Sequence, residues 1–127
     1  MTTQNTLVQI AQRAEDLARA TRFYAMLLER DALATFDPPG LAFFDLGGTR
    51  LLLDTGAPSC LFYVRVGDLD GAMARLRAAG VEVVSEPHVI FSHEDSTLGP
   101  EGTDEWMAFV KDSEGNAVGL VEQRPRG

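Results

Sequence analysis

The sequence predicts an α+β fold made of two βαβββ modules, residues 7–54 and 60–123, which together form a cleft-enclosing, barrel-like curved sheet. Each module ends in a similar hairpin, at residues 41–54 and 106–123, with short apolar runs on both sides of a glycine-bearing turn. Each also contains an Asp-Leu pair that follows a strand-like run and opens a helical pattern. An internal repeat fixes the architecture, because both copies adopt the same topology; chance similarity of two short patterns is the alternative. The two pairs are Asp16-Leu17 and Asp68-Leu69.

The first module begins with the alternating residues 7–13, which predict a strand, and continues with a helix. Apolar residues recur at helical spacing after the first-turn carboxylates of Glu15 and Asp16. Residues 30–36 predict a weaker strand that ends at the turn Asp37-Pro38-Pro39-Gly40, and the hairpin follows. The helical apolar positions are Leu17, Ala20, Tyr24, Leu27 and Leu28.

The second module repeats this order after a loop-rich linker, residues 55–59. Residues 60–66 alternate like a strand, and Asp68 caps a helix that stops at Gly80. Residues 81–85 predict the next strand.

The second module carries one addition, the polar residues 86–105, which predict an extra loop. A loop of this length in a compact domain is usually functional or disordered. We expect residues 124–127, after the last hairpin, to fray.

Length and composition predict a single domain over residues 1–127, since 45% apolar residues are enough for a real core. The net charge of −8 argues against nucleic acid and membrane surfaces as partners. The single Cys60 excludes an internal disulfide, and the first six residues lack the basic cluster and apolar core of an export signal. No apolar run is long enough to span a bilayer, so we expect a soluble cytoplasmic protein.

Several short motifs of the chain, taken together, are typical of one known family. They are Asp16-Leu17, Phe23-Tyr24, Ala42-Phe43-Phe44 before Gly47-Gly48, Asp68-Leu69, Gly80-Val81 and Lys111-Asp112-Ser113-Glu114-Gly115-Asn116. With them the chain resembles the vicinal oxygen chelate superfamily, which contains glyoxalase I, bleomycin resistance proteins and extradiol dioxygenases. The resemblance covers nearly the whole chain and implies a small organic ligand and a homodimer. It leaves the activity open, because one fold hosts many chemistries.

The resemblance also implies a divalent metal ion held by one side chain from each of four strands, the last of them usually a glutamate. In this chain the matching positions are Gln9, Leu52, Leu61 and Gly119. Leucine and glycine offer no side-chain donor, and one neutral amide cannot hold a hard divalent cation alone. We therefore expect no metal and no other cofactor there, with a divalent metal as the alternative. Alignment slips toward Asp54 or Glu122 would turn a side chain to the other face or displace it by about 7 Å.

If the side chains at those four positions point inward, every second residue of the same strands points inward too. The surface that they form is apolar in its middle, with cations and one phenol nearer the strand ends. An apolar pocket with a few converging polar groups is the usual form of a small-molecule site. Solvated arginines at a rim, a packing role for Tyr63 and a structural amide at Gln9 are the alternatives. The ligand contacts predicted from these faces are Gln9, Arg13, Arg50, Tyr63 and Arg65.

Two histidines, His88 and His93, fall in the predicted loop with several acids near them in sequence. They could form a separate metal site or an acid–base pair, but their spacing matches no strong ligand signature. We add His88 to the predicted ligand contacts. Trp106, at the start of the last hairpin, is either a stacking platform or a core anchor, and we include it as well.

Two functions from different classes remain. In the first, the protein is a metal-independent binding module, similar to the bleomycin resistance branch, that holds a small organic molecule in its cleft. In the second, it is a lyase, isomerase or oxygenase of the same superfamily that takes its metal or acid–base residues from residues 86–105. A filled cleft in a mere scaffold is a third possibility. The sequence leaves open whether the cleft forms within one chain or across a swapped dimer.

Overall fold

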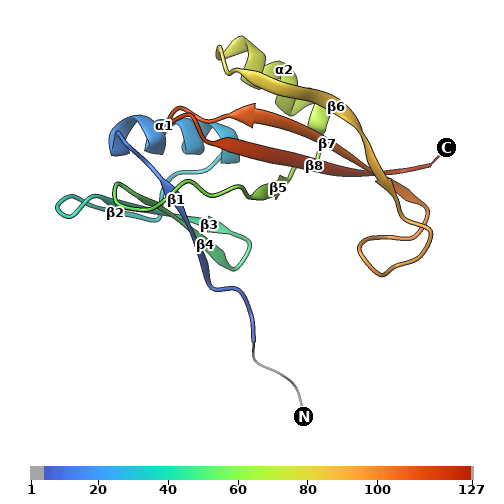
Figure 1. Ribbon diagram of the computed structural model, residues 1–127, viewed down its shortest axis with the longest axis horizontal. Helices are drawn as coiled ribbons and strands as arrows, with labels where there is room; N and C mark the ends of the chain where they lie inside the picture. Colours follow the sequence, from blue (N-terminus) through green and yellow to red (C-terminus); the bar gives the residue numbers. More distant parts are fainter. Residues whose placement is uncertain (1–4, 127) are drawn as a thin grey trace. The chain divides into compact units, whose positions relative to one another are not determined.

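The computed structural model describes residues 5–126, and the chain divides into two compact units, Met1–Cys60 and Leu61–Gly127. Both units have the same order of elements, a strand, a helix and then three strands (Figure 1). The α+β fold with two βαβββ modules is therefore confirmed.

The first unit forms one four-stranded mixed sheet with the strand order β1-β4-β3-β2. Strand β1 runs parallel to β4, and the other neighbours are antiparallel. Helix α1 contacts β3 and β4, whose fully buried side chains Ala42, Phe44, Leu51 and Leu53 lie on one face. The elements are β1 (Gln9–Arg13), α1 (Leu17–Leu28), β2 (Ala34–Phe36), β3 (Leu41–Leu46) and β4 (Thr49–Asp54).

The second unit repeats this topology with the strand order β5-β8-β7-β6. Strand β5 is parallel to β8, and β8, β7 and β6 are antiparallel neighbours. Helix α2 contacts β6 and β8. Fully buried Ala108, Val110, Val118 and Leu120 share one face of the sheet. The elements are β5 (Tyr63–Arg65), α2 (Leu69–Ala78), β6 (Val83–Ser92), β7 (Thr103–Lys111) and β8 (Ala117–Pro125).

Both helices begin at the two Asp-Leu pairs of the repeat. The Asp16 carboxylate accepts a hydrogen bond from the Arg19 amide at 3.0 Å, and the Asp68 carboxylate accepts one from the Gly71 amide at 3.1 Å. Each aspartate satisfies one of the amides that a helix start leaves without a partner. The repeat thus extends to the hydrogen bonds that start each helix.

Residues 86–105 do not form one loop, so that prediction is wrong at both ends of the segment. Strand β6 continues to Ser92 and β7 already begins at Thr103, which leaves a loop over residues 93–102 (Figure 1). The register between β6 and β7 shifts at three places. Such irregularities break the alternation by which a strand is predicted, and this is why the sequence pattern did not reveal β6 at its full length.

The last residues of the chain are also more ordered than predicted. Strand β8 runs to Pro125, and the Arg126 amide donates to the Gly102 carbonyl at 2.9 Å. The expected fraying is therefore wrong for residues 124–126, whereas Gly127 lies outside the described residues.

Candidate functional site

Each sheet has one face toward its own helix and an opposite face, which we call its open face. On the first sheet, strand pairing places Gln9, Arg13 and Arg50 on the open face together with Leu52. The shared face predicted for these residues is confirmed. Arg50 Nε donates to Gln9 Oε1 at 2.9 Å, whereas Arg13 lies at the other end of β1 and pairs with Glu15 at 3.4 Å. The structure thus joins Gln9 to Arg50 and leaves Arg13 apart from them.

An aromatic pair occupies the middle of the second open face. The rings of Tyr63 and Phe109 meet edge-on with their centroids 5.8 Å apart, and Gly119 lies between the two residues in the strand pairing. A Cβ atom at Gly119 would lie 2.4 Å from Tyr63 Cδ2, so the Tyr63 ring stands directly over this glycine. Because Tyr63 remains 52% exposed, its ring is accessible from outside the sheet.

Arg65 lies one row farther along the same open face. It is exposed and pairs in register with Val121 of β8, which in turn pairs with Met107 of β7. Within residues 5–126, its guanidinium makes no hydrogen bond or ion pair. A cation without a partner next to an apolar row is one of the features expected of a small-molecule site.

A hydrogen-bonded cluster at the end of the second open face was not among the predicted ligand contacts. Glu105 Oε1 accepts a bond from His93 Nε2 at 2.9 Å and another from Gln123 Nε2 at 3.1 Å. The bond from Gln123 holds the pKa of the Glu105 carboxyl below its usual value; burial opposes this, while His93 and the charge of Arg65 add to the lowering. Glu105 is therefore a carboxylate at neutral pH.

The alternation of β7 could have identified Glu105, because it has the parity of Met107. We missed it because residues 86–105 read as a loop, in which alternation has no meaning. Of the acids near the two histidines in sequence, Glu105 is hydrogen-bonded to His93, and an acid–base role for the histidines stays a prediction.

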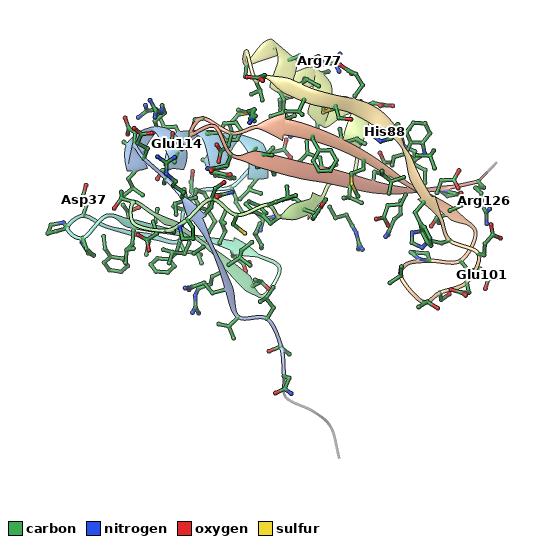
Figure 2. All side chains as sticks on the ribbon, in the orientation of Figure 1. Asp37, Arg77, His88, Glu101, Glu114 and Arg126 are labelled. Carbon is green, nitrogen blue, oxygen red and sulfur yellow. The ribbon has the colours of Figure 1, made fainter. Side chains whose placement is uncertain are left out.

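His88 and Trp106 occupy opposite faces of the second sheet. His88 pairs in register with Met107, is exposed, and its Nδ1 lies 2.8 Å from the Glu86 carbonyl oxygen. In Figure 2 it lies on β6, between the labels of Arg77 on α2 and of Arg126 beside the 93–102 loop. Trp106 has the other parity, and the guanidinium of Arg124 stacks 4.5 Å from the centre of its ring. The structure therefore does not bring Trp106 together with the other predicted contacts.

The residues at the four positions where the resemblance places metal ligands do not fit a metal ion. Leu52 and Leu61 carry no donor atoms, Gly119 has no side chain, and Gln9 Oε1 already accepts from Arg50. In the described part of the chain, no three side chains of the types His, Cys, Asp and Glu gather closely enough to hold an ion.

The two neighbouring acids do not fit either. Asp54 accepts from the Gly56 amide at 2.8 Å, and Glu122 is on the face of Trp106, where it accepts from the Leu69 amide at 2.8 Å. Both carboxylates are thus engaged in local structure, and that of Glu122 points away from the open face.

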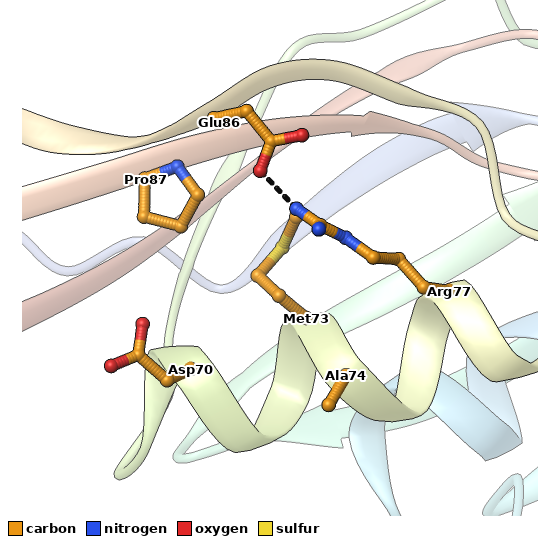
Figure 3. A pocket seen from close by; sticks show the side chains of 6 residues that line it. All are labelled: Asp70, Met73, Ala74, Arg77, Glu86 and Pro87. Carbon is orange, nitrogen blue, oxygen red and sulfur yellow. Dashed lines mark hydrogen bonds and ion pairs between the residues drawn. The ribbon is translucent and has the colours of Figure 1, made fainter.

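A shallow groove of about 350 Å³ lies between α2 and the start of β6 (Figure 3). Its charged groups satisfy one another, since Arg77 pairs with Glu86 across the groove and Asp70 pairs with Arg124 at 3.2 Å. Exposed pairs of this kind contribute little energy and leave no charge for a ligand. We therefore look for candidate sites on the open face of each unit taken by itself. The groove is lined by Asp70, Met73, Ala74, Arg77, Glu86 and Pro87.

Solved structures with the same fold come from several bacteria. A lactoylglutathione lyase from Agrobacterium tumefaciens is 20% identical, with a TM-score of 0.69 over 95% of this chain and 96% of that one. TioX from Micromonospora sp. ML1 is 22% identical, with a TM-score of 0.66 over 93% and 98%. A glyoxalase/bleomycin resistance protein/dioxygenase from Alicyclobacillus acidocaldarius is 17% identical, with a TM-score of 0.65 over 97% and 95%. At these identities the likeness concerns the fold alone.

The sequence itself was compared with curated proteins and with family models. No curated protein matched it. None of the helices in the described range is long and apolar enough to cross a membrane. The family model of the glyoxalase/bleomycin resistance protein/dioxygenase superfamily matches residues 6–120. The chain, with its two βαβββ units, belongs to this superfamily.

Proposed function

We propose that this protein binds a small organic molecule with an aromatic or other flat apolar part, without a metal ion at the superfamily's usual position. The observation that carries the proposal is the Tyr63 ring, which is half exposed and supported edge-on by Phe109. On the same face stands the guanidinium of Arg65, which has no partner within residues 5–126. A flat apolar group can pack on such an aromatic surface, while Arg65 supplies a charge for an acidic group.

The first unit supports the same proposal with an open face of similar character. Leu52 and Phe43 pair in the middle of this face, and Arg50 and Gln9 form a polar pair at one end. Because Arg50 keeps further donors after bonding Gln9, this pair can also orient a polar group of a ligand.

The proposed metal independence rests on the surroundings of Gly119, which occupies the place of the superfamily's usual glutamate ligand. The Tyr63 ring fills the space into which a side chain at Gly119 would project, and Leu52 and Leu61 offer no donors. An aromatic ring at the place of a carboxylate favours an apolar ligand contact over ion binding. Catalysis is the alternative, since one protein of the same fold is a lactoylglutathione lyase.

A binding titration tests the ligand proposal, with 3-phenylpropionate as the probe because it combines a phenyl ring with a carboxylate. We expect amide NMR signals of residues 63, 109 and 119 to shift. The variants Tyr63→Ala and Arg65→Gln should each weaken binding about five- to tenfold, since each loses one principal contact. Arg77→Gln, which removes the same charge from the groove beside α2, is the matched control and should leave binding unchanged. Equal effects of the two arginine variants would contradict the proposal.

Metal analysis tests the other half of the proposal. We expect protein purified without chelator to contain far less than one equivalent of Fe, Mn, Ni or Zn, and added EDTA to leave the melting temperature unchanged. A near-stoichiometric metal that is lost on replacing His88 and Glu105 would instead support the enzyme.

We extend the proposal to a homodimer in the cytoplasm. Strand β6 is the edge of its sheet and carries the exposed apolar side chains of Val84, Ile90 and Phe91, which a second subunit would cover. The single free Cys60 fits a reducing compartment. Light scattering of the purified protein tests the dimer, and a monomer mass would refute it.

A further inference from the structure

We propose that Glu105 binds a protonated amine of the ligand on the second open face and that His93 and Gln123 are its positioning residues. This inference rests on the proposed function, because it assigns a chemical class to a group of the same bound molecule. It adds a carboxylate of β7 that lies outside the four positions of the implied metal site.

The two oxygens of the Glu105 carboxylate have different surroundings. Oε1 accepts both bonds, from His93 Nε2 and from Gln123 Nε2, whereas Oε2 has no partner among residues 5–126. The Glu105 side chain remains 21% exposed, so water or a ligand can reach it. A carboxylate held by one oxygen presents the other in a fixed direction.

The residues behind Glu105 are held firmly. The His93 side chain is only 1% exposed, and Phe91 packs edge-on against it with centroids 4.9 Å apart. The backbone of the 93–102 loop covers the ring so closely that a Cβ at Gly99 would lie 2.8 Å from His93 Cε1. The His93 carbonyl accepts bonds from the Gly102 amide at 2.9 Å and from Arg126 Nη2 at 3.3 Å.

One nitrogen of His93 indicates what the ring contributes. Nε2 carries the hydrogen, because a carboxylate can only accept, and buried Nδ1 has no partner within the described chain. Leaving a buried polar atom unpaired lowers stability. The polar contribution of the ring is therefore the single bond that it donates to Glu105.

The charge around Glu105 selects the class of ligand group. One carboxylate with one histidine is too few ligands for a divalent cation, and within residues 5–126 no group of three such side chains forms a metal site. Arg65 is near enough to act on Glu105 electrostatically, yet the two form no ion pair. An ammonium group gives Oε2 a charge-assisted hydrogen bond, which is about twice as strong as one from a neutral donor. The apolar row of Met107 and Val121 beside Glu105 then receives the rest of the molecule.

Titration of the full chain with 2-phenylethylamine, followed by amide NMR, tests the proposal. We expect Glu105→Gln to weaken binding of this amine at least about tenfold, the loss of one charge-assisted bond, and to leave binding of 3-phenylpropionate within about twofold. Arg65→Gln should have the reverse effect, weakening the acid and not the amine. Glu86→Gln, which removes an exposed acid from β6, is the matched control and should change neither.

The positioning role has its own readout. Gln123→Leu removes one donor from Glu105 and should weaken the amine about threefold in the natural chain, yet have no further effect in the Glu105→Gln background. A merely structural role would weaken both probes in both backgrounds. The same comparison can be made with His93→Gln. If that variant does not fold, the comparison of Gln123→Leu in the two backgrounds still decides whether Glu105 is positioned by its neighbours.

Two failures can be told apart. Unchanged amine binding in Glu105→Gln, with 3-phenylpropionate still dependent on Arg65, would overturn the role of Glu105 and leave the proposed function intact. No shift of residues 63, 109 and 119 with either probe would contradict both.

Discussion

Replacing Asp112 with alanine should lower the free energy of unfolding by about 2–4 kcal/mol, measured by urea denaturation. Asp112 is 6% exposed and organises the turn between β7 and β8. One of its carboxylate oxygens accepts from the amides of Glu114 and Asn116, both at 2.8 Å, and the other accepts from Asn116 Nδ2 at 2.9 Å. Alanine would remove the charged acceptor of these three buried hydrogen bonds, and that loss of charge-assisted bonds accounts for the size of the effect.

The repeat supplies the matched control. Asp45 has the corresponding place in the first unit, where its carboxylate accepts from the Gly48 amide at 3.1 Å, but it is exposed. Water replaces the lost acceptor there, so Asp45→Ala should cost less than about 1 kcal/mol. Asp112→Asn keeps one acceptor oxygen and should fall between the two. Equal losses for Asp45→Ala and Asp112→Ala would show that burial does not set the cost.

The parts of the fold that could be predicted are those fixed by neighbouring residues. Asp16 and Asp68 cap their helices as expected, and the glycine turns join the expected hairpins, because caps and turns need only a few consecutive residues. The internal repeat predicted the order of helices and strands, since both halves had to share one topology.

The site could be predicted only where strand alternation was regular. Gln9 and Arg50 share an open face because β1 and β4 pair without a bulge, and parity alone gave this result. His93 and Glu105 were not recognised as partners within a sheet, because their bond depends on how far β6 and β7 extend. The residues near Trp106 in sequence do not determine which face of the sheet its side chain takes. That face follows from the register of β7 with β8.

Replacing Gly119 with glutamate, the residue usual at this place in the superfamily, should lower the free energy of unfolding by about 1–3 kcal/mol. Its Cβ would lie 2.4 Å from Tyr63 Cδ2 and 3.2 Å from Phe109 Cε1, so the Tyr63 ring must leave its place. The cost arises from the lost ring contact and from the displacement of neighbours. Gly67→Glu is the control, because no atom lies within 4 Å of a Cβ at that glycine, and it should cost less than about 0.5 kcal/mol.

Removing the ring decides whether Tyr63 is the cause. In a Tyr63→Ala background, Gly119→Glu should cost less than about 0.5 kcal/mol, because the space over Gly119 is then free and a glycine inside a strand is itself unfavourable. The double variant should bind 3-phenylpropionate no better than Tyr63→Ala alone, since the aromatic surface is gone. A Gly119→Glu protein that is as stable as the natural chain while Tyr63 keeps its contact with Phe109 would show that the ring does not hold this position. The space would then be open to a carboxylate, and Tyr63 would no longer exclude a metal ligand at this position.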